Sequence, residues 1–304
     1  MFRATCTVVL LALSACGRIG FDPPGSTTDV GGDGVAMGIE PPIMSVDPAG
    51  LPPFGTPIVV PGLSLPGIDD DDPALSRDQL EIFFDSFRGG NDDLYTAHRA
   101  SIAEPWTTPV PLTAINTPSA EEHPALSANG LTLYFTSARG GDSNVWMTTR
   151  ADRSSPFGTP VVVPSVNTAL DDRMGSADAL DQALFVSSNR AGGSDMLYEA
   201  RRAGASAAWP SPQLVAEIVT SAGDPSVHVD DRGLVMYLIQ GAGDSDLFWT
   251  KRAQPGSPWA ATIAVTELDT TASESDPWLS PDLRTIYFVR ATGPGTKDIF
   301  MASR

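Results

Sequence analysis

The stretch 71-DDPALSRDQLEIFFDSFRGGNDDLYTAHR-99 decides the fold of this 304-residue chain, because the chain repeats it. Two close variants are 121-EEHPALSANGLTLYFTSARGGDSNVWMTTR-150 and 274-ESDPWLSPDLRTIYFVRATGPGTKDIFMASR-304. Self-similarity at a fixed period is the signature of a repeat architecture, in which each copy forms one unit and neighbouring units bury a shared core. The sequence therefore predicts an array of like units.

The repeat has a period of about 50 residues from position 54 onward. One aromatic residue marks the start of each unit: Phe54, Trp106, Phe157, Trp209 and Trp259. These aromatics are 52, 51, 52 and 50 residues apart. Within the units, apolar runs alternate with turns that in several units contain Asn-Gly or Gly-Gly, whose glycines readily adopt positive φ. Four short strands in a unit of this length are typical of a β-propeller blade.

The phase of the repeat predicts the number of blades. The first copy begins with the strand that belongs at the outer edge of a blade, at about Thr56–Val60, and the last copy ends after its third strand, at the C-terminus. We therefore expect an all-β, five-bladed β-propeller over residues 51–304. Its N-terminal strand completes the last blade and closes the ring, which leaves no open sheet edge there.

The repeated pattern Asp-Pro-x-Leu-Ser, Ser-x-Arg-Gly-Gly and Asp-Leu-Tyr resembles the WD40-like, or PD40, repeats of TolB-type propellers. The resemblance covers residues 54–304 and weakens in two units. Unit three has Arg173-Met174 in place of Asp-Pro, and unit four has 241-GAGD-244 without the Ser and Arg. The resemblance implies the fold more than a function. We interpret the domain as a non-enzymatic protein-binding or assembly module.

The N-terminus predicts export and a lipid anchor. Arg3 precedes a short apolar run, residues 8–13, which is too short to span a bilayer and is typical of a secretory signal. The run ends in 13-LSAC-16, which resembles the bacterial lipobox, in which the cysteine is lipidated and becomes the first mature residue. The alternative is ordinary signal cleavage beside a chance cysteine. We expect a signal peptide over 1–15, with Cys16 lipidated.

Residues 16–50 are rich in Gly, Pro, Asp, Ser and Thr and show no helix or strand period, which predicts a flexible tether. Gly17 follows the cysteine. In the resembled lipoproteins an Asp there favours inner-membrane retention, so Gly17 points to the outer membrane. We therefore expect an outer-membrane lipoprotein of the bacterial cell envelope, facing the periplasm or the cell surface, whose partners are other envelope proteins.

Composition excludes several other classes. The formal net charge of -18 disfavours nucleic-acid and phosphate partners. Cys6 lies in the predicted signal and Cys16 would carry lipid, so the mature domain has no disulfide, catalytic thiol or cysteine-based zinc site. Neither a Gly-x-Ser-x-Gly elbow nor a His-Glu-x-x-His motif is present, and the histidines are His98, His123 and His228. We expect a monomer without a cofactor.

The loops that carry the Asp-Pro pairs are expected to surround one end of the propeller channel. The candidate ligand-binding residues at this mouth are Asp72, His123, Arg173, Asp224 and Asp276. Repeated residues are first of all structural, so units three and four, which depart from the repeat, make the ring chemically mixed. We expect this ring to bind a ligand without catalysis. The alternative is a five-bladed glycosidase or a glycan-binding lectin that uses its carboxylates.

The run 69-DDDD-72 superficially resembles a calcium loop. Adjacent carboxylates on an extended strand point in opposite directions, however, and the ligand spacing of an EF-hand is absent. We therefore expect a solvated acidic surface here and no metal site.

Overall fold

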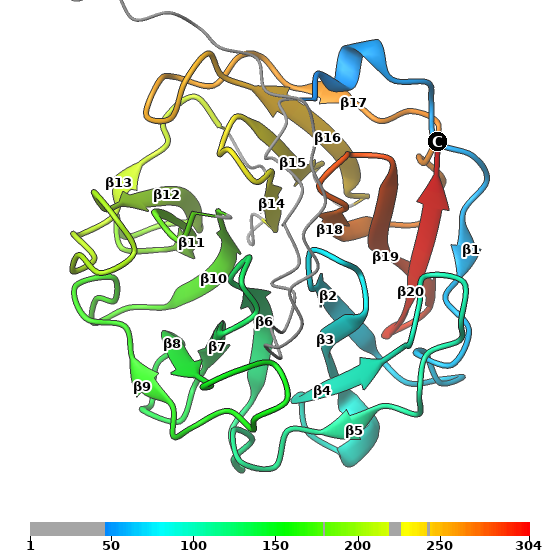
Figure 1. Ribbon diagram of the computed structural model, residues 1–304. Helices are drawn as coiled ribbons and strands as arrows, with labels where there is room; N and C mark the ends of the chain where they lie inside the picture. Colours follow the sequence, from blue (N-terminus) through cyan, green and yellow to red (C-terminus); the bar gives the residue numbers. More distant parts are fainter. Residues whose placement is uncertain (1–45, 179, 219–225, 242–243) are drawn as a thin grey trace, which may run out of the picture. The chain divides into compact units, whose positions relative to one another are not determined.

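The computed structural model describes residues 46–178, 180–218, 226–241 and 244–304. Over these residues, five four-stranded antiparallel sheets surround a central channel (Figure 1). The predicted five-bladed β-propeller is confirmed. The expected signal peptide, Cys16 and nearly all of the expected tether lie outside the described residues. Within the described part, no helix has the length and apolar character needed to cross a membrane.

Each blade contributes one strand to each of four concentric positions. The innermost strands, which line the channel, are β2 (Asp70–Leu75), β6 (Glu121–Leu126), β10 (Asp172–Ala177), β14 (Val227–Val229) and β18 (Glu274–Leu279). The second strands are β3 (Glu81–Ser86), β7 (Thr132–Ser137), β11 (Ala183–Ser188), β15 (Val235–Gln240) and β19 (Thr285–Gly293). The third strands are β4 (Asp93–His98), β8 (Asn144–Thr149), β12 (Met196–Arg201), β16 (Asp246–Lys251) and β20 (Thr296–Ser303). The outermost strands are β5 (Val110–Pro111), β9 (Val161–Val162), β13 (Gln213–Leu214), β17 (Ile263–Ala264) and β1 (Ile58–Val59). Short 3-10 helices occupy Pro48–Gly50 and Phe87–Gly89.

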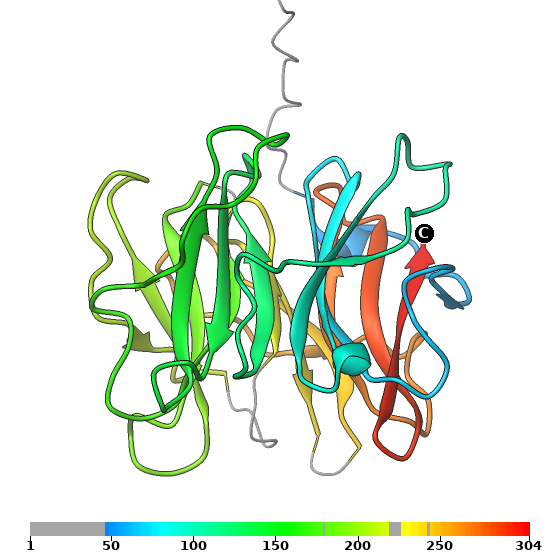
Figure 2. The same ribbon diagram turned by 90° about the horizontal axis from the view of Figure 1, so that it is seen from below.

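The N-terminal strand closes the ring as predicted. Strand β1 pairs antiparallel with β20 and lies beside it at the edge of the propeller (Figure 2). On either side of this pairing, Gly55 N donates to Ser303 O at 2.8 Å and Val60 N donates to Ile299 O at 2.9 Å. The last blade therefore takes three strands from the C-terminus and one from the N-terminal segment.

Apolar residues cover both faces of the blades because each sheet is packed between two neighbours. On β7, Leu133 and Phe135 pack with Phe83 of blade one, the β2–β5 sheet. Tyr134, which points to the opposite face of the same strand, packs with Met174 of blade three, the β10–β13 sheet. The core is therefore a ring of inter-blade clusters, which a single isolated blade cannot form.

The repeated aromatics have a structural role. The arginine that directly follows the third strand of each blade stacks on the aromatic that precedes the outermost strand. The guanidinium carbon lies 3.9–4.6 Å from the ring centroid in all five pairs, which are Arg99–Trp106, Arg150–Phe157, Arg202–Trp209, Arg252–Trp259 and Arg304–Phe54. In the fifth pair the two ends of the domain meet. The aromatic repeat therefore also holds the ring closed.

The Ser-x-Arg-Gly-Gly motif is structural as well. In blades one, two and three, the arginine of this motif forms an ion pair with a buried acid at the start of the innermost strand. In blade five, Arg290 forms the equivalent pair. These pairs are Arg88–Asp70, Arg139–Glu121, Arg190–Asp172 and Arg290–Glu274. Each arginine also donates to a backbone carbonyl of the preceding loop, as Arg139 does to Ile115 O at 2.7 Å. Buried acids with such partners maintain the blade, so these copies are poor candidates for chemistry.

Candidate functional site

One residue from each blade faces the channel at the same level. These residues are Asp72, His123, Met174, Ser226 and Asp276. Together with the residue that follows each of them, they surround a cavity of about 30 Å³. We call this set the axial ring. A space of this size accommodates an ion or a water molecule, and a drug-sized ligand needs at least ten times as much.

The structure brings together three of the five predicted ring residues: Asp72, His123 and Asp276. The prediction for Arg173 is wrong, because Met174 occupies the ring position. Arg173 instead forms ion pairs with Asp195 at 3.0 Å and with Asp171 at 3.5 Å.

Asp224 lies outside the described residues. Counted back along the sequence from Ser226, its position corresponds to that of Asp70 in unit one rather than to that of the ring residue Asp72. The ring position therefore lies one residue later than predicted in unit three and two residues later in unit four, the two units in which no proline follows the ring residue.

The Asp-Pro pairs were expected in loops, but they lie within the innermost strands, which begin two residues earlier. Asp72 and Asp276 lie inside β2 and β18, where the pairing register shifts at a bulge. Their φ angles are 53° and 50°, and His123 of β6 has a φ of 51°. Asp and His tolerate this left-handed region better than most side chains do. The bulge turns each of these side chains towards the axis.

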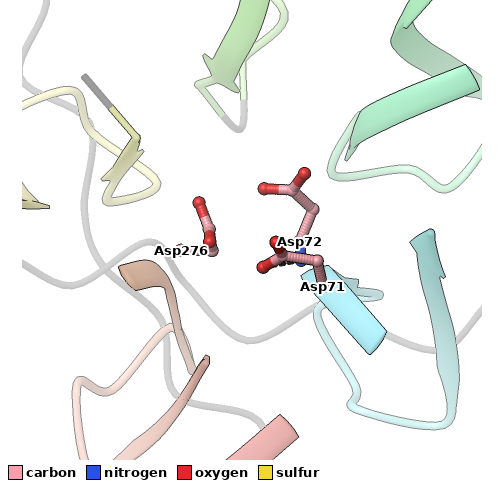
Figure 3. Close-up of side chains that lie close together, drawn as sticks. All are labelled: Asp71, Asp72 and Asp276. Atoms are coloured by element: carbon pink, nitrogen blue, oxygen red, sulfur yellow. Dashed lines mark hydrogen bonds between the residues drawn. The ribbon is translucent and has the colours of Figure 1, made fainter. Parts of the chain in front are cut away.

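Three carboxylates converge at the axial ring. Asp71, Asp72 and Asp276 each place an oxygen within 4.8 Å of the others (Figure 3). The backbone N–H of His123 donates to Asp72 Oδ2 at 3.3 Å, and His123 Nε2 lies 3.7 Å from the same oxygen. On the neighbouring strand, Asp85 pairs in register with Asp71. We call Asp71, Asp72, Asp85 and Asp276 the axial acid cluster.

The predicted solvated acidic surface is wrong for most of the run 69-DDDD-72. Asp70 has no exposed surface and Asp71 is 9% exposed. Asp70 is held by the ion pair with Arg88, and Asp71 forms an ion pair with Lys297 of β20. The bulge after Asp71 breaks the simple alternation of an extended strand, so successive carboxylates need not point to opposite faces.

Burial and mutual repulsion dominate the electrostatics of the axial acid cluster. Burial and the neighbouring charge of Asp276 raise the pKa of both Asp71 and Asp72 well above the usual range. Burial also raises the pKa of Asp85 to about 7. The pKa of Asp276 is lowered instead: burial opposes ionisation, but hydrogen bonds from Asp71 and Asp72 and the charge of Lys297 favour it. Four carboxyl groups thus share one neighbouring ammonium group.

Sequence reasoning did not identify two members of this site, although a comparison of the units contains a signal for both. The position of Asp85 is occupied in the other units by Thr136, Ser187, Ile239 and Val289. The position of Lys297 is occupied by Asp92, Ser143, Asp195 and Ser245. Asp85 is the one charged residue at its repeat position and Lys297 is the one cation at its own, and departures of this kind indicate a specific role.

The other end of the channel is bridged by an ion pair. Arg77 follows β2 of blade one and Asp231 follows β14 of blade four, and Arg77 Nε donates to Asp231 Oδ2 at 2.8 Å. Both line a cavity of about 40 Å³, together with His228 and Trp278. Because blade five lies between blades one and four, this ion pair spans the channel.

His228 makes the fold sensitive to acid. Burial lowers its pKa to about 3 from the usual 6.5. Between these pH values the unfolded chain binds a proton that the native state does not, so stability falls as the pH decreases from about 6.5. The loss should reach about 2–3 kcal/mol near pH 4.5. In urea titrations, His228→Gln should reduce the stability difference between about pH 7.5 and 4.5 by that amount. An unchanged difference would contradict this assignment.

Two larger grooves lie between blades on the outer part of the propeller, with volumes of about 460 and 400 Å³. They share an anatomy. The first contains the Glu199–Arg252 ion pair with Trp259 stacked on the arginine, and the second contains the Glu81–Arg150 ion pair with Phe157 stacked in the same way. The outer strand or the residue after it adds an aliphatic wall, Leu214 in the first groove and Leu112 in the second.

No family model matches the sequence, and no curated protein matches it. Solved structures match by fold. A thermostable family-43 glycoside hydrolase has a TM-score of 0.58 at 10% identity, and the match covers 79% of this chain and 90% of that one. The catalytic domain of a GH62 α-L-arabinofuranosidase from Coprinopsis cinerea has a TM-score of 0.54 at 13% identity, with coverage of 83% and 96%.

TolB from Acinetobacter baumannii is also similar, with a TM-score of 0.48 and 14% identity over 77% of this chain. The chain spans about half of that TolB chain, 54% of its length. All three identities are low, so the similarity to the two hydrolases shows a shared propeller fold. Function must be argued from the site.

Proposed function

We propose that this chain is a lipid-anchored β-propeller of the bacterial cell envelope that binds another protein and has no catalytic activity. The observation that carries the proposal is the small size of the axial cavity. Its cavity of about 30 Å³ is an order of magnitude smaller than typical small-molecule sites. A sugar ring therefore has no room between the carboxylates of the axial ring.

The alternative, a glycosidase, needs two carboxyl groups on opposite sides of a bound sugar. Their separation is about 5–5.5 Å in retaining enzymes and about 6.5–9.5 Å in inverting ones. In the axial acid cluster, Asp71, Asp72 and Asp276 instead approach within 4.8 Å and surround an ion-sized space. Asp71 is further engaged by Lys297. This geometry supports a structural or binding role for the axial acids.

The two outer grooves are better suited to a partner. Their volumes of about 460 and 400 Å³ fall within the range of ligand sites, and each combines aromatic and aliphatic walls with an ion pair. A segment of a partner protein that inserts an apolar side chain would find these groups aligned. The net charge of -18 would favour a partner with a basic surface. We therefore assign partner binding to these grooves.

The test is affinity capture from envelope extracts with the acyl-free domain, compared with two variants. Leu214, in the first groove, is 45% exposed, and Ile263, on an outermost strand outside both grooves, is 51% exposed. Leu214→Arg should weaken capture of a specific protein by about tenfold or more, as loss of an interface anchor does. The matched control Ile263→Arg should capture it normally. Equal capture by both variants would refute the groove assignment.

A screen of arabinan and xylan substrates should show no turnover. Hydrolysis that disappears in Asp72→Asn or Asp276→Asn would instead establish the glycosidase. Both substitutions keep a residue that tolerates the positive φ at these positions, so loss of activity could not be attributed to the backbone.

Cys16→Ser should release the protein from membranes. The expectation rests on 13-LSAC-16 and on the weak membrane affinity of an unlipidated signal-cleaved chain. Fractionation of cells that express the wild-type protein or the variant checks it. A variant that stays with the membrane fraction and is processed at the same site would show that the chain is not a lipoprotein.

A further inference from the structure

We propose that the axial acid cluster is a Ca²⁺ site, with Asp71, Asp72 and Asp276 as ligands and Asp85 hydrogen-bonded to Asp72 beside them. The three ligand oxygens lie within 4.8 Å of one another. Oxygens bound to one Ca²⁺ at about 2.3–2.6 Å are at most about 5 Å apart, so a single ion can contact all three. The carboxylates come from two blades and point towards one another (Figure 3).

A second observation at this site is independent of the convergence of the three ligands. Asp85 is 5% exposed, and its Oδ1 atom has no hydrogen-bond partner within the part of the chain that the structure describes. Its carboxyl group reaches Asp72 and faces the same cluster. A buried carboxylate oxygen without a donor is costly, and a bound cation removes that cost.

The charges on the protein side do not balance. Among the described residues, the four carboxyl groups of the cluster face the ammonium group of Lys297, which contacts Asp71, and the imidazole of His123, which lies 3.7 Å from Asp72 Oδ2 and is a cation only when protonated. Asp92 and Glu122 add further negative charge around Asp85. Ring position 174 carries an uncharged methionine, and Arg173 is directed to Asp171 and Asp195. A divalent cation would supply the missing positive charge.

Ca²⁺ fits the site better than Mg²⁺ does. Mg²⁺ usually retains several of its water molecules, whereas Ca²⁺ accepts a shell made largely of protein carboxylates and hydroxyls in irregular geometry. The cavity of about 30 Å³ leaves room for the ion and little water. Ser226, whose hydroxyl hydrogen-bonds Asp276, adds another oxygen at the ring. The site therefore favours the larger and less hydrated cation.

Lys297 is the built-in competitor of this ion. Its ammonium group lies against Asp71, so it repels a cation bound to the same carboxylate. Removing its charge should strengthen Ca²⁺ binding. If Lys297 were instead the permanent counter-ion of the cluster, removing its charge would not strengthen Ca²⁺ binding, because the carboxyl groups would take up protons in its absence.

The experiment is calorimetric titration of the metal-depleted domain with CaCl₂, together with thermal unfolding in Ca²⁺ and in EDTA. The wild-type domain should bind one equivalent of Ca²⁺, and a saturating concentration of about 100 times Kd should raise Tm by about 5–10 °C. Asp72→Asn and Asp276→Asn should each weaken binding by at least about tenfold, and Lys297→Gln should tighten it by about tenfold or more. MgCl₂ should bind more weakly than CaCl₂.

The matched control is Asp246→Asn, in a second acidic group formed by Asp246, Asp269 and Glu274. Glu274 is already engaged by Arg290 at 2.7 Å, so this group has less capacity for a cation. The variant should bind Ca²⁺ as the wild type does. The proposal is overturned if the wild type does not bind Ca²⁺, if Asp72→Asn and Asp276→Asn bind it normally, or if Asp246→Asn alone abolishes binding. Neither partner capture nor glycan turnover enters this result.

Discussion

A chain that begins at residue 61 should lose most of its stability, because it lacks the strand that closes the ring. The deletion removes the buried Phe54 and Val60 and exposes the edge of β20. Losing a buried Phe costs about 3–5 kcal/mol and a buried Val about 1.5–3 kcal/mol. The sum is comparable to the whole stability of an ordinary domain, about 5–15 kcal/mol. Urea denaturation followed by circular dichroism measures the loss.

A chain that begins at Val46 is the control, since it keeps β1 and its flanking hydrogen bonds. It should unfold at the same urea concentration as a chain that begins at residue 17. The single substitution Phe54→Ala should destabilise the domain by about 3–5 kcal/mol, because Phe54 packs in the core and stacks under Arg304. If the two truncated chains are equally stable, the N-terminal strand does not hold the ring closed.

Arg150→Met should destabilise the propeller by about 3–5 kcal/mol. Arg150 and Glu81 are each 4% exposed and form a two-pronged ion pair between blades two and one, with N–O distances of 2.8 and 2.6 Å. Removal of the arginine leaves the Glu81 carboxylate buried without its principal partner. Equilibrium unfolding in urea is again the measurement.

Two comparisons make this result specific. The double variant Arg150→Met, Glu81→Met should recover most of the lost stability, because it removes the buried charge as well as its partner. Arg153→Met should cost no more than about 1 kcal/mol, because its ion pair with Asp78 is 41% and 42% exposed. If the double variant is as unstable as Arg150→Met, packing of the arginine side chain, including its contact with Phe157, accounts for the loss.

The architecture was largely predictable. The aromatic period and the turn sequences predict the blades, and the phase of the repeat predicts the closing strand that β1 supplies. These features are local or periodic, so every unit repeats them. A wrongly predicted strand or turn in one unit can therefore be recognised by comparison with the others. The sequence did not predict the buried ion pairs between the repeated Arg and acidic residues.

The axial site was predictable only in part. Asp72, His123 and Asp276 each precede a proline, which makes their common position recognisable in the sequence. They were placed together correctly. Unit three lacks the proline, and a bulge between Met174 and Ser176 shifts its register, so the sequence could not show that Met174 rather than Arg173 reaches the ring. A shift of one residue moves a side chain to the other face of the strand.

The sequence by itself determined the propeller, its five blades and their closure, because periodic hydrophobic and turn residues act within one repeat and its neighbours. Only the tertiary structure decided which charges meet at the axis. Asp85 and Lys297 are separated by more than 200 residues, yet both lie at Asp71, because the closed ring brings blade five against blade one. The burial that raises the pKa of the axial carboxyl groups likewise arises only when all five blades surround them.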